Sequence, residues 1–582
     1  MANKNISQIK FAMENTPHKL SYLSGTSNTP LLGITIGDQF DQTVAQYPNN
    51  DALIVYHQNI RWTYQQLQQE VDQCARAFMT IGLQKGDRIG IWAPNRYEWL
   101  VTQIATAKIG AILVNINPSY RVHELKYALN QSGCKMLITA DQFKQSNYTQ
   151  MLYELAPELN TCPAGQLKSK ELPNLTTIIR LHSDDSPGMY PWQYFIDTFA
   201  EDTSAEALAV QQTGLAFDEP INIQYTSGTT GYPKGATLSH HNILNNGYFV
   251  ARTMNFTDQD RLIIPVPLYH CFGMVMGNLG CITHGATMIY PSEGFEPDKV
   301  LQAAEQDKAT AIYGVPTMFI AELEHPDFDK HNYGSLRTGI MAGSPCPIEV
   351  MKQVQSKMHM SEVQIAYGMT ETSPVSTQTR VGTPLQKQVS TVGQIHPHLE
   401  VKVIDPETGK VVPVNTAGEL CTRGYSVMLG YWNDEEKTRQ AIDNARWMHT
   451  GDLATIDEDG YINIVGRIKD MIIRGGENVY PREIEEFLYT HPDISDVQVI
   501  GVPDKKYGEE IMAWVKLKEG KALTLEDIKE FCQGKIAHFK VPRYVKFTDE
   551  FPMTVTGKIR KVEMRKVSVQ ELGLESEKME TA

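Results

Sequence analysis

The chain has 582 residues and a mass of 65.5 kDa, with 41% hydrophobic and 21% charged residues, a mixture typical of globular proteins. This composition excludes whole-chain disorder, and the length favours roughly three or four domain-sized units. Lys and Arg number 53 against 68 Asp and Glu, so the net charge is 53 − 68 = −15. Non-specific binding to nucleic acid or to anionic membranes is therefore not expected, because phosphate contacts need clustered cations.

The eight cysteines are spread along the chain without a C-x-x-C pair or a cluster with histidine. This spacing suggests neither a zinc site nor a disulfide framework, and it favours a reducing compartment. The first 60 residues contain no arginine, and no apolar segment follows the start. We therefore expect neither a mitochondrial transit peptide nor a secretory signal, and we predict a cytoplasmic location.

Apolar runs rich in β-branched residues alternate with helical patterns over most of the chain. Residues 88–92, 111–116 and 135–139 are expected to be strands, and the spacing of residues 99–109 and 122–129 predicts helices between them. Such alternation implies right-handed βαβ crossovers and parallel sheets covered on both faces. The fold class predicted for the N-terminal body is therefore α/β.

Two later segments need separate interpretation. Residues 200–219 are rich in Ala, Gln, Thr and acidic side chains, which predicts a surface connection. Residues 262–292 contain no Asp, Glu, Lys or Arg and are long enough to span a bilayer. Prolines, histidines and glycines interrupt this run, so we expect a buried strand, a turn and a helix of small residues instead of a membrane segment.

The pattern changes towards the C-terminus, where a small α+β domain is predicted. Strands are expected at 461–465, 497–502 and 512–517, with helices at 481–489 and after Thr524. Thr524 and Asp527 have the spacing of a capping box. The resulting division is an N-terminal extension 1–34, a large body 35–468, a mobile C-terminal domain 469–567, and a loose tail 568–582.

The strongest local signal is Y-T-S-G-T-T-G-Y-P-K-G at residues 225–235, which follows the apolar run 221–223. Its glycines let backbone N–H groups turn toward an anion, its hydroxyls add donors, and Lys234 supplies positive charge. It differs from a Walker A loop because Gly235 follows the lysine where Ser or Thr would stand. The segment therefore predicts a phosphate-binding loop of another kind.

This segment resembles the phosphate-binding loop of the adenylate-forming superfamily, which includes acyl-CoA synthetases, firefly luciferase and peptide-synthetase adenylation domains. Five further motifs follow in the order that the superfamily shows: M-A-G-S-P at 341–345, A-Y-G-M-T-E at 366–371, H-T-G-D at 449–452, G-R-I-K-D to Y-P at 466–481, and P-M-T-V-T-G-K at 552–558. The resemblance covers roughly residues 35 to 567. The segments P-L-Y-H-C, G-Y-S-V-M-L-G-Y-W and K-I-A-H-F-K-V-P are most similar to medium-chain acyl-CoA synthetases of the family-member-2 type.

The resemblance implies a nucleotide site in which each residue type suits its task. Tyr367 offers a flat face for adenine, Asp452 accepts from both ribose hydroxyls, Arg467 donates to the ribose or phosphate edge, and Thr370 donates to the α-phosphate. Glu371 is a hard oxygen ligand suited to Mg²⁺. The full set expected to bind the nucleotide is Thr226, Ser227, Gly228, Thr229, Thr230, Gly231, Lys234, Gly343, Ser344, Pro345, Tyr367, Gly368, Thr370, Asp452, Arg467 and Lys558.

The implied reaction has two steps that share one active site. The substrate carboxylate first attacks the α-phosphorus of ATP, and a thiol then attacks the acyl-adenylate. Lys234, Lys558, Thr370 and Glu371 are the expected catalytic residues, because two anions must be brought together. By the same resemblance, the C-terminal domain rotates about a hinge at Lys469, and Gly475, Gly476 and Glu477 contact the pantetheine arm of coenzyme A.

The resemblance also places an acyl pocket. Its expected lining is Val266, Tyr269, His270, Met274, Tyr313, Gly314 and Met341, which would give an apolar wall. His270 is interpreted as a polar gate, with a hydrogen-bonded core histidine as the alternative. The sequence does not locate the floor of the pocket, on which chain-length preference depends.

We therefore expect an acid–thiol ligase that uses ATP, Mg²⁺ and coenzyme A to activate a fatty acid of medium chain length. The expected partners are these small molecules, without nucleic acid or an integral membrane segment, and the protein is expected to be a monomer or homodimer. An acyl-AMP ligase that loads a carrier protein is one alternative, although the compact motif spacing shows no insertion. A luciferase-like oxygenase and a non-catalytic nucleotide-binding or acyl-adenylate-binding protein are the others.

Overall fold

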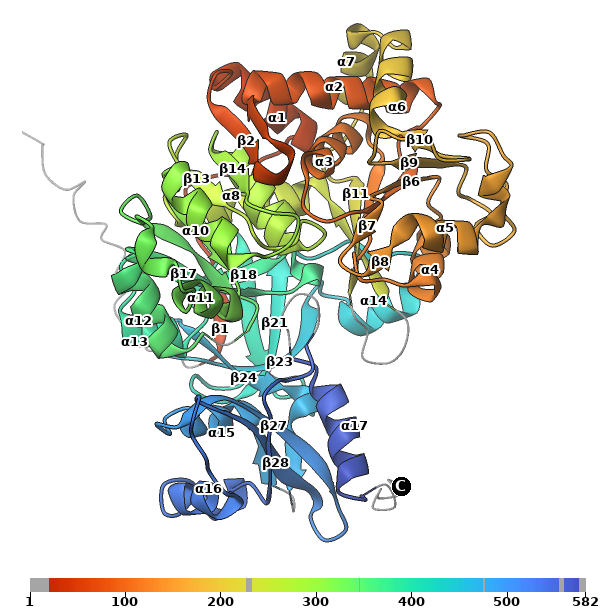
Figure 1. Ribbon diagram of the computed structural model, residues 1–582. Coiled ribbons are helices and arrows are strands. Elements are labelled where there is room, and N and C mark those ends of the chain that lie inside the picture. The colour runs from red at the N-terminus through yellow and green to blue at the C-terminus, as the bar shows by residue number, and fades with distance from the viewer. Residues whose placement is uncertain (1–19, 227–232, 345, 475–476, 554–558, 575–582) are drawn as a thin grey trace, which may run out of the picture.

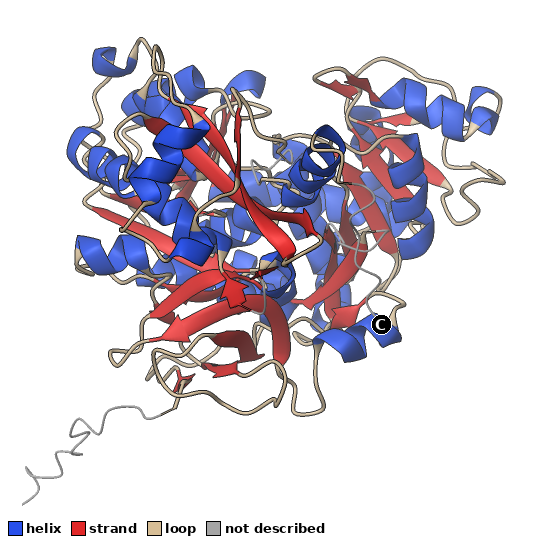
Figure 2. Cartoon of the chain, turned by 90° about the horizontal axis from the view of Figure 1, so that it is seen from below, coloured by secondary structure: helices blue, strands red, loops and turns tan. Residues whose placement is uncertain are grey.

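The computed structural model describes residues 20–226, 233–344, 346–474, 477–553 and 559–574. It confirms the predicted α/β class, with two large sheets of mixed direction and two smaller sheets nearer the C-terminus. Figure 1 shows the first helices at the top, the antiparallel strands β21, β23 and β24 in the middle, and the C-terminal domain below them. Seen from below in Figure 2, helices surround the strands.

Helices cover the sheets along the whole described chain. Their bounds are α1 Ile36–Gln46, α2 Tyr64–Thr80, α3 Tyr97–Ile109, α4 Val122–Ser132, α5 Tyr148–Leu155, α6 Trp192–Phe199, α7 Ala205–Thr213, α8 His240–Thr253, α9 Gly280–Ile282, α10 Pro297–Gln306, α11 Pro316–Leu323, α12 Ile348–Lys357, α13 Leu385–Ser390, α14 Glu435–Ala441, α15 Pro481–Leu488, α16 Leu525–Cys532 and α17 Lys561–Glu571.

The first large sheet has eight strands, parallel from β10 to β11 and antiparallel at β12 and β22. Its strands, in spatial order, are β10 Tyr190–Pro191, β9 Thr177–Arg180, β6 Met136–Thr139, β4 Arg88–Trp92, β5 Ile112–Asn115, β11 Pro220–Thr226, β12 Lys234–Ser239 and β22 Gly430–Tyr431. A small hairpin, β7 Gln142–Phe143 and β8 Ser146–Asn147, lies apart from it. The expected strands at 88–92, 111–116 and 135–139 are thus neighbours in one sheet.

The second large sheet has nine strands, of which β17 to β2 run parallel. Its order is β19 Gln394–Ile395, β18 Val375–Gln378, β17 Glu362–Gly368, β16 Thr338–Ala342, β15 Ala311–Gly314, β13 Arg261–Ile263, β14 Thr287–Tyr290, β2 Asp51–Val55 and β3 Ile60–Thr63. Consecutive residues of a strand face opposite sides of the sheet. Ile340 accordingly packs in the central core with Ile89 and Val114 of the eight-stranded sheet, while Met341 packs under α10 to α12.

A third, antiparallel sheet links the body to the C-terminal domain. Its order is β1 Tyr22–Ser24, β20 Leu399–Ile404, β21 Gly418–Gly424, β23 Met448–Ile456 and β24 Ile462–Arg467. Strand β1 pairs with β20, so part of the segment 1–34 that we expected as an extension belongs to this sheet. The body's first helix, α1, begins after Thr35, whose side chain forms a capping box with Asp38.

The C-terminal sheet follows β24 directly along the chain. It consists of β26 Glu477–Val479, β25 Ile472–Arg474, β28 Gly508–Leu517, β27 Ile494–Asp504 and β29 Tyr544–Phe547. Alternate residues of β28 divide between two clusters: Ala513 and Val515 face α15 and α16, whereas Met512 and Trp514 face α17. Against the body, Arg482 Nη1 donates to the Ile464 carbonyl over 2.6 Å.

Two expectations need correction, and one is refined. The loose tail was expected from 568, but α17 continues to Glu571, and Leu574 is only 8% exposed because it packs near Trp514. Residues 200–219 lie mostly at the surface as expected, and they include a helix, α7, that buries Leu208. In the uncharged run, the turn leads into a buried π-helix, Phe272–Leu279, where an ordinary helix was expected.

Membrane insertion through a helix finds no support in the described chain. None of its helices combines the length and the apolarity needed to cross a bilayer. The uncharged run is instead buried between the two large sheets, from β13 to β14.

Candidate nucleotide and acyl site

The predicted adenine-binding residues lie at the carboxyl ends of two neighbouring parallel strands. Ala342, the last residue of β16, pairs with Ala366 of β17, so Gly343 follows one strand where Tyr367, the last residue but one, continues the other. Gly343 has φ +94°, a left-handed conformation that a side chain would strain. Ligands of open α/β sheets bind at such an edge. Ser344 is half-buried there, and Pro345 lies outside the described residues.

Gly368 permits a close turn directly after the tyrosine. A Cβ atom at this position would stand 1.7 Å from the Pro374 carbonyl oxygen, so only glycine fits. The chain then forms a short 3-10 turn, Thr370–Thr372, in which Thr370 and Glu371 are 9% and 6% exposed. Two of the four predicted catalytic residues, Thr370 and Glu371, are therefore held in a buried turn shortly after Tyr367.

Tyr367, Asp452 and Arg467 form one hydrogen-bonded group. The Tyr367 hydroxyl donates to Asp452 Oδ2 over 2.6 Å, and Arg467 Nε donates to Asp452 Oδ1 over 3.0 Å. Asp452 and Arg467 are cross-strand partners of β23 and β24. Burial and the Asp452 carboxylate raise the pKa of Tyr367 well above its usual value, so its hydroxyl remains a donor. These contacts bring the expected adenine and ribose residues together.

The expected phosphate loop begins and ends on an antiparallel pair. Thr226, the last residue of β11, is opposite Lys234, the first of β12. The loop positions Ser227, Gly228, Thr229, Thr230 and Gly231 lie outside the described residues. Thr226 Oγ1 lies 3.4 Å from Glu371 Oε1, so the base of the loop meets the 3-10 turn.

Tyr431 is a residue of this group that the sequence analysis missed. Its hydroxyl donates to Glu371 Oε1 over 2.9 Å, and Lys234 Nζ lies 5.0 Å from the centroid of its ring. One tyrosine thus contacts both the expected magnesium ligand and the expected phosphate lysine. A hollow of about 430 Å³, lined partly by Tyr431 and Trp432, opens beside it.

Four of the expected acyl-pocket residues gather in the central core. Val266, Met274 and Tyr313 are buried there, and Tyr269 packs against them. The π-helix that carries Met274 is tied to the eight-stranded sheet by buried amides of Asn115 and Gln224, whose nitrogens lie 3.1 Å from the Met274 sulfur. π-Helical turns are frequent at functional sites.

His270 lies just before this π-helix. It is half-buried, and its Nδ1 accepts a hydrogen bond from the Phe272 backbone over 3.2 Å. Both interpretations of His270, gate and core histidine, remain compatible with this position.

The structure separates Met341 and Gly314 from the other acyl-pocket candidates. Met341 packs with Ile312 and Phe319 on the opposite face of the nine-stranded sheet. A Cβ atom on Gly314 would meet Phe319 at 3.0 Å, so this glycine faces the same side. Strand alternation directs their neighbours Ile340 and Tyr313 toward the core, so these contacts do not support a place for Met341 and Gly314 beside the other candidates, and their pocket role stays a prediction.

The C-terminal candidates are only partly described. Lys469 lies exposed in a 3-10 turn, Ile468–Asp470, between β24 and β25. Although Lys469 is exposed, partial desolvation by the surrounding protein atoms and the nearby Arg467 lower its pKa. Glu477 begins β26 opposite Arg474. Gly475, Gly476 and Lys558 lie outside the described residues.

A second cluster behind Asp452 also escaped the sequence analysis. The side chains of Glu419 and Cys421 on β21 meet His449 on β23, and donor atoms of all three lie within 4.8 Å of one another. The cysteine spacing had suggested no cluster with histidine, yet the antiparallel pairing brings together residues 28 positions apart. Such a group can hold a metal ion, but Glu419 Oε2 already lies 2.9 Å from His449 Nδ1, the distance of a hydrogen bond.

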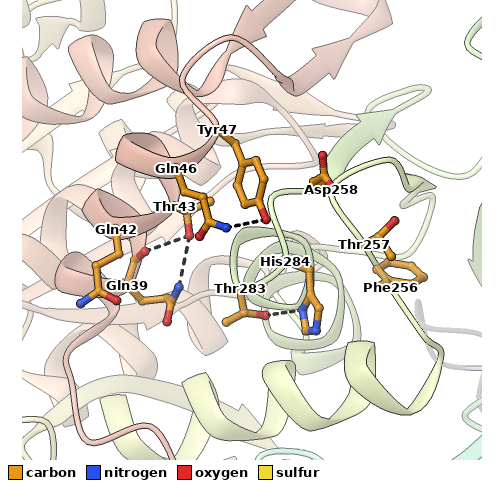
Figure 3. A pocket seen from close by; sticks show the side chains of 10 residues that line it. All are labelled: Gln39, Gln42, Thr43, Gln46, Tyr47, Phe256, Thr257, Asp258, Thr283 and His284. Carbon is orange, nitrogen blue, oxygen red and sulfur yellow. Dashed lines mark hydrogen bonds between the residues drawn. The ribbon is translucent and has the colours of Figure 1, made fainter.

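One further recess lies apart from all of these residues. It measures about 350 Å³ and opens between α1 and the segments that flank α8 and α9 (Figure 3). Its lining is mostly polar: Gln39, Gln42, Thr43, Gln46, Tyr47, Phe256, Thr257, Asp258, Thr283 and His284. It contains none of the predicted site residues, and we assign it no role.

Comparison with known proteins gives a consistent result. Residues 40–432 match the family "AMP-binding enzyme", and residues 483–558 match "AMP-binding enzyme C-terminal domain". The chain is 50% identical to "Putative acyl-CoA synthetase YngI" of Bacillus subtilis, covering 94% of this chain and 99% of that one. It is 45% identical to the mitochondrial medium-chain acyl-CoA ligase ACSF2 of Bos taurus, covering 95% and 91%.

The fold has close counterparts among solved structures. The ATP-bound MatB from Rhodopseudomonas palustris superposes with a TM-score of 0.79 at 29% identity, covering 92% of this chain and 99% of that one. The fold and the site together define an adenylate-forming ligase. The chain belongs to the AMP-binding enzyme family, and the resemblance drawn from its motifs is confirmed.

Proposed function

We propose that this chain is an ATP-dependent medium-chain acyl-CoA synthetase that forms an acyl-adenylate and converts it to acyl-CoA. The observation that supports it most is the meeting of Tyr367, Asp452 and Arg467, from strands of two sheets, in one hydrogen-bonded group. The relatives named as acyl-CoA synthetase and medium-chain acyl-CoA ligase support the reaction and the acid class.

In the first step, an oxygen of the acid attacks the α-phosphorus of ATP, and the bond from that phosphorus to the bridging oxygen breaks to release pyrophosphate. Tyr367 and Asp452 would hold adenine and ribose, which fixes the α-phosphate relative to the acid. Lys234 and Lys558 would offset the repulsion between the two anions. Positioning and electrostatic stabilisation are the main contributions a protein makes to such transfers.

Glu371 fits the role of magnesium ligand. It is a carboxylate only 6% exposed, and its Oε1 is oriented by Tyr431 and Thr226. Oxygen ligands of this kind suit Mg²⁺, which would neutralise part of the charge on the nucleotide phosphates when bound. Thr370, in the same turn, would donate its hydroxyl to the α-phosphate.

In the second step, the sulfur of coenzyme A attacks the acyl carbonyl, and AMP leaves with the electron pair of the broken anhydride bond. We propose that the C-terminal domain, from 469 to 567, rotates about Lys469 between the steps. Lys558 would serve the first step, and Gly475, Gly476 and Glu477 the second. Lys469→Pro fixes φ and should slow thioester formation while leaving adenylation intact; unchanged overall turnover would contradict the hinge.

The acid would enter beside Val266, Tyr269, Met274 and Tyr313, with His270 near the point of thioester formation. An apolar wall of this kind selects an aliphatic chain, since each buried methylene contributes about 0.8 kcal/mol. We further propose that the protein acts in the cytoplasm as a monomer or homodimer. The bovine relative is named as mitochondrial, so fractionation of the native protein is the required check.

The test is product analysis across a panel of acids. With MgATP and coenzyme A, octanoate should yield octanoyl-CoA, AMP and pyrophosphate in equal amounts, at a higher kcat/KM than acetate, palmitate or benzoate. A preference for an aryl or long-chain acid would contradict the medium-chain assignment. Formation of ADP and phosphate would contradict the reaction itself.

Two alternatives have distinct signatures in the same assay. A ligase that loads a carrier protein would transfer the acyl group to an acyl carrier protein and leave coenzyme A unused. A non-catalytic binding protein would bind AMP and release no pyrophosphate with any acid.

A further inference from the structure

The structure assigns Glu419 and His449 as positioning residues for Asp452, through the turn that precedes that aspartate. This inference rests on the proposed role of Asp452 in holding the ribose. Glu419 and His449 do not belong to the nucleotide-binding set above, so the inference adds two residues to the machinery of the site.

Asp452 lies in an irregular part of the β21–β23 pairing. Cys421 pairs with His449 and Glu419 with Leu453, so two steps along β21 correspond to four along β23. Three residues, Thr450 to Asp452, therefore stand opposite Leu420 alone and bulge from the ladder, and Gly451 has φ +69°. Bulges of this type reorient side chains and are common beside active sites. A bulge also leaves backbone N–H groups without ladder partners.

Side chains supply the missing partners. Glu419 Oε1 accepts the Gly451 N–H over 3.3 Å, and Thr450 Oγ1 accepts the Asp452 N–H over 3.1 Å. The Thr450 hydroxyl in turn donates to the Leu420 carbonyl over 2.6 Å. Side-chain hydrogen bonds therefore hold the bulge against β21. Asp452 is the last residue of this bulge, so the same hydrogen bonds limit its movement.

His449 orients the Glu419 carboxylate, which accepts the Gly451 N–H. Its Nδ1 lies 2.9 Å from Glu419 Oε2, while Oε1 of the same carboxylate remains available to Gly451. Its Nε2 lies 3.8 Å from Asp443 Oδ2, and Cys421 Sγ lies 3.7 Å from Nδ1. The Glu419 side chain is 12% exposed, so little solvent competes for it. One carboxylate thus contacts both ends of the segment 449–451.

The test compares two nucleotides that differ only where Asp452 acts. Dissociation constants are measured for AMP and for 2′,3′-dideoxyAMP, which lacks both ribose hydroxyls. Asp452→Asn should weaken AMP binding and leave dideoxyAMP binding unchanged. Glu419→Ala should weaken AMP binding about tenfold, with a change of less than about twofold for dideoxyAMP. Glu419→Gln retains an oxygen acceptor for the Gly451 N–H, so it should weaken AMP binding less than Glu419→Ala does.

A matched control is available on the neighbouring strand. Glu400 of β20 is ion-paired with Arg423 over 2.7 Å, outside the 449–452 segment, and Glu400→Ala should leave both nucleotides unaffected. Equal weakening of AMP and dideoxyAMP in Glu419→Ala would indicate a general structural role and overturn the inference. The ratio of the dissociation constants for dideoxyAMP and AMP separates the remaining outcomes. If Asp452→Asn alters this ratio and Glu419→Ala does not, the positioning role is overturned while the ribose contact of Asp452 stands. If Asp452→Asn leaves the ratio unchanged, the proposed ribose contact is overturned, and the positioning role with it.

Discussion

The Tyr367 hydroxyl donates to Asp452 Oδ2 over 2.6 Å and so joins strand β17 of the nine-stranded sheet to strand β23 of the antiparallel sheet. The Tyr367 ring, expected to face adenine, and the Asp452 carboxylate, expected to bind ribose, are therefore held in a fixed relative position by this hydrogen bond. Arg467, on the next strand, holds the other carboxylate oxygen. This arrangement orients Asp452 before any nucleotide arrives, and pre-orientation reduces the entropy lost on binding.

Tyr367→Phe removes the hydroxyl and keeps the aromatic ring, so it tests the two parts of this side chain separately. The aromatic face remains, while Asp452 loses a donor, so we expect KM for ATP to rise about tenfold with a smaller change in kcat. Steady-state kinetics with saturating octanoate and coenzyme A measures this. Tyr22→Phe is the control, because Tyr22 donates to the Glu400 carboxylate over 2.5 Å and neither residue belongs to the expected nucleotide-binding set. A fall in kcat at constant KM would contradict the role given to the hydroxyl.

Tyr431→Phe tests how Glu371 is held. Loss of the 2.9 Å hydrogen bond leaves the carboxylate less constrained, while the ring beneath Lys234 is retained. We expect the Mg²⁺ concentration for half-maximal pyrophosphate release to rise roughly fivefold to tenfold. Tyr56→Phe, which removes a comparable hydrogen bond to Asp307, serves as control. An unaltered Mg²⁺ requirement would show that Tyr431 does not orient Glu371.

Met274→Ala and Met341→Ala form a matched pair, since both methionines are buried and lie on opposite faces of the nine-stranded sheet. Met274→Ala should shift the preferred acid longer by about two carbons, with about a fourfold change in kcat/KM per methylene. Met341→Ala should cost about 2–5 kcal/mol of stability without shifting the preference. Initial rates with C6 to C14 acids and thermal unfolding distinguish them. The reverse pattern would restore Met341 to the pocket.

His449 provides a pH-dependent contribution to stability. The adjacent Cys421 sulfur and the Glu419 carboxylate raise the pKa of His449 from 6.5 to about 10, with Asp443 also facing the ring. A pKa raised by folding means that the folded state binds the proton more tightly, so the contribution is complete below pH 6.5 and declines as pH approaches 10. The Tm of the wild type should therefore exceed that of His449→Gln most at about pH 6.5 and below, and the difference should shrink as pH approaches 10. A Tm difference that grew with pH would contradict this protonation state.

Local signals in the sequence predicted much of the fold. The strand at 88–92 was predicted with its observed bounds, because a short β-rich run ends at a turn there. The capping box of Thr524 and Asp527 begins α16 as expected. The resemblance assigned Asp452 and Arg467 to the same part of the nucleotide, and the β23–β24 pairing places them opposite each other. These features depend on residues close together in the sequence.

Features that depend on distant strands were missed. Tyr431 reaches Glu371 from 60 positions away, and Glu419 reaches His449 from 30, through sheet pairings that no local pattern reveals. The grouping of Tyr313 with Gly314 on one pocket wall disregarded the rule that neighbours in a strand face opposite sides. The loose tail was placed too early, at 568, because the apolar residues of α17 become buried only when they meet Trp514 on β28.

The two-step reaction is tested most directly by a rapid-quench experiment with MgATP and octanoate in the absence of coenzyme A. We expect one equivalent of enzyme-bound octanoyl-adenylate and one of pyrophosphate, followed by conversion to octanoyl-CoA and AMP when coenzyme A is added. Release of pyrophosphate only after coenzyme A is present would contradict a two-step reaction through an acyl-adenylate.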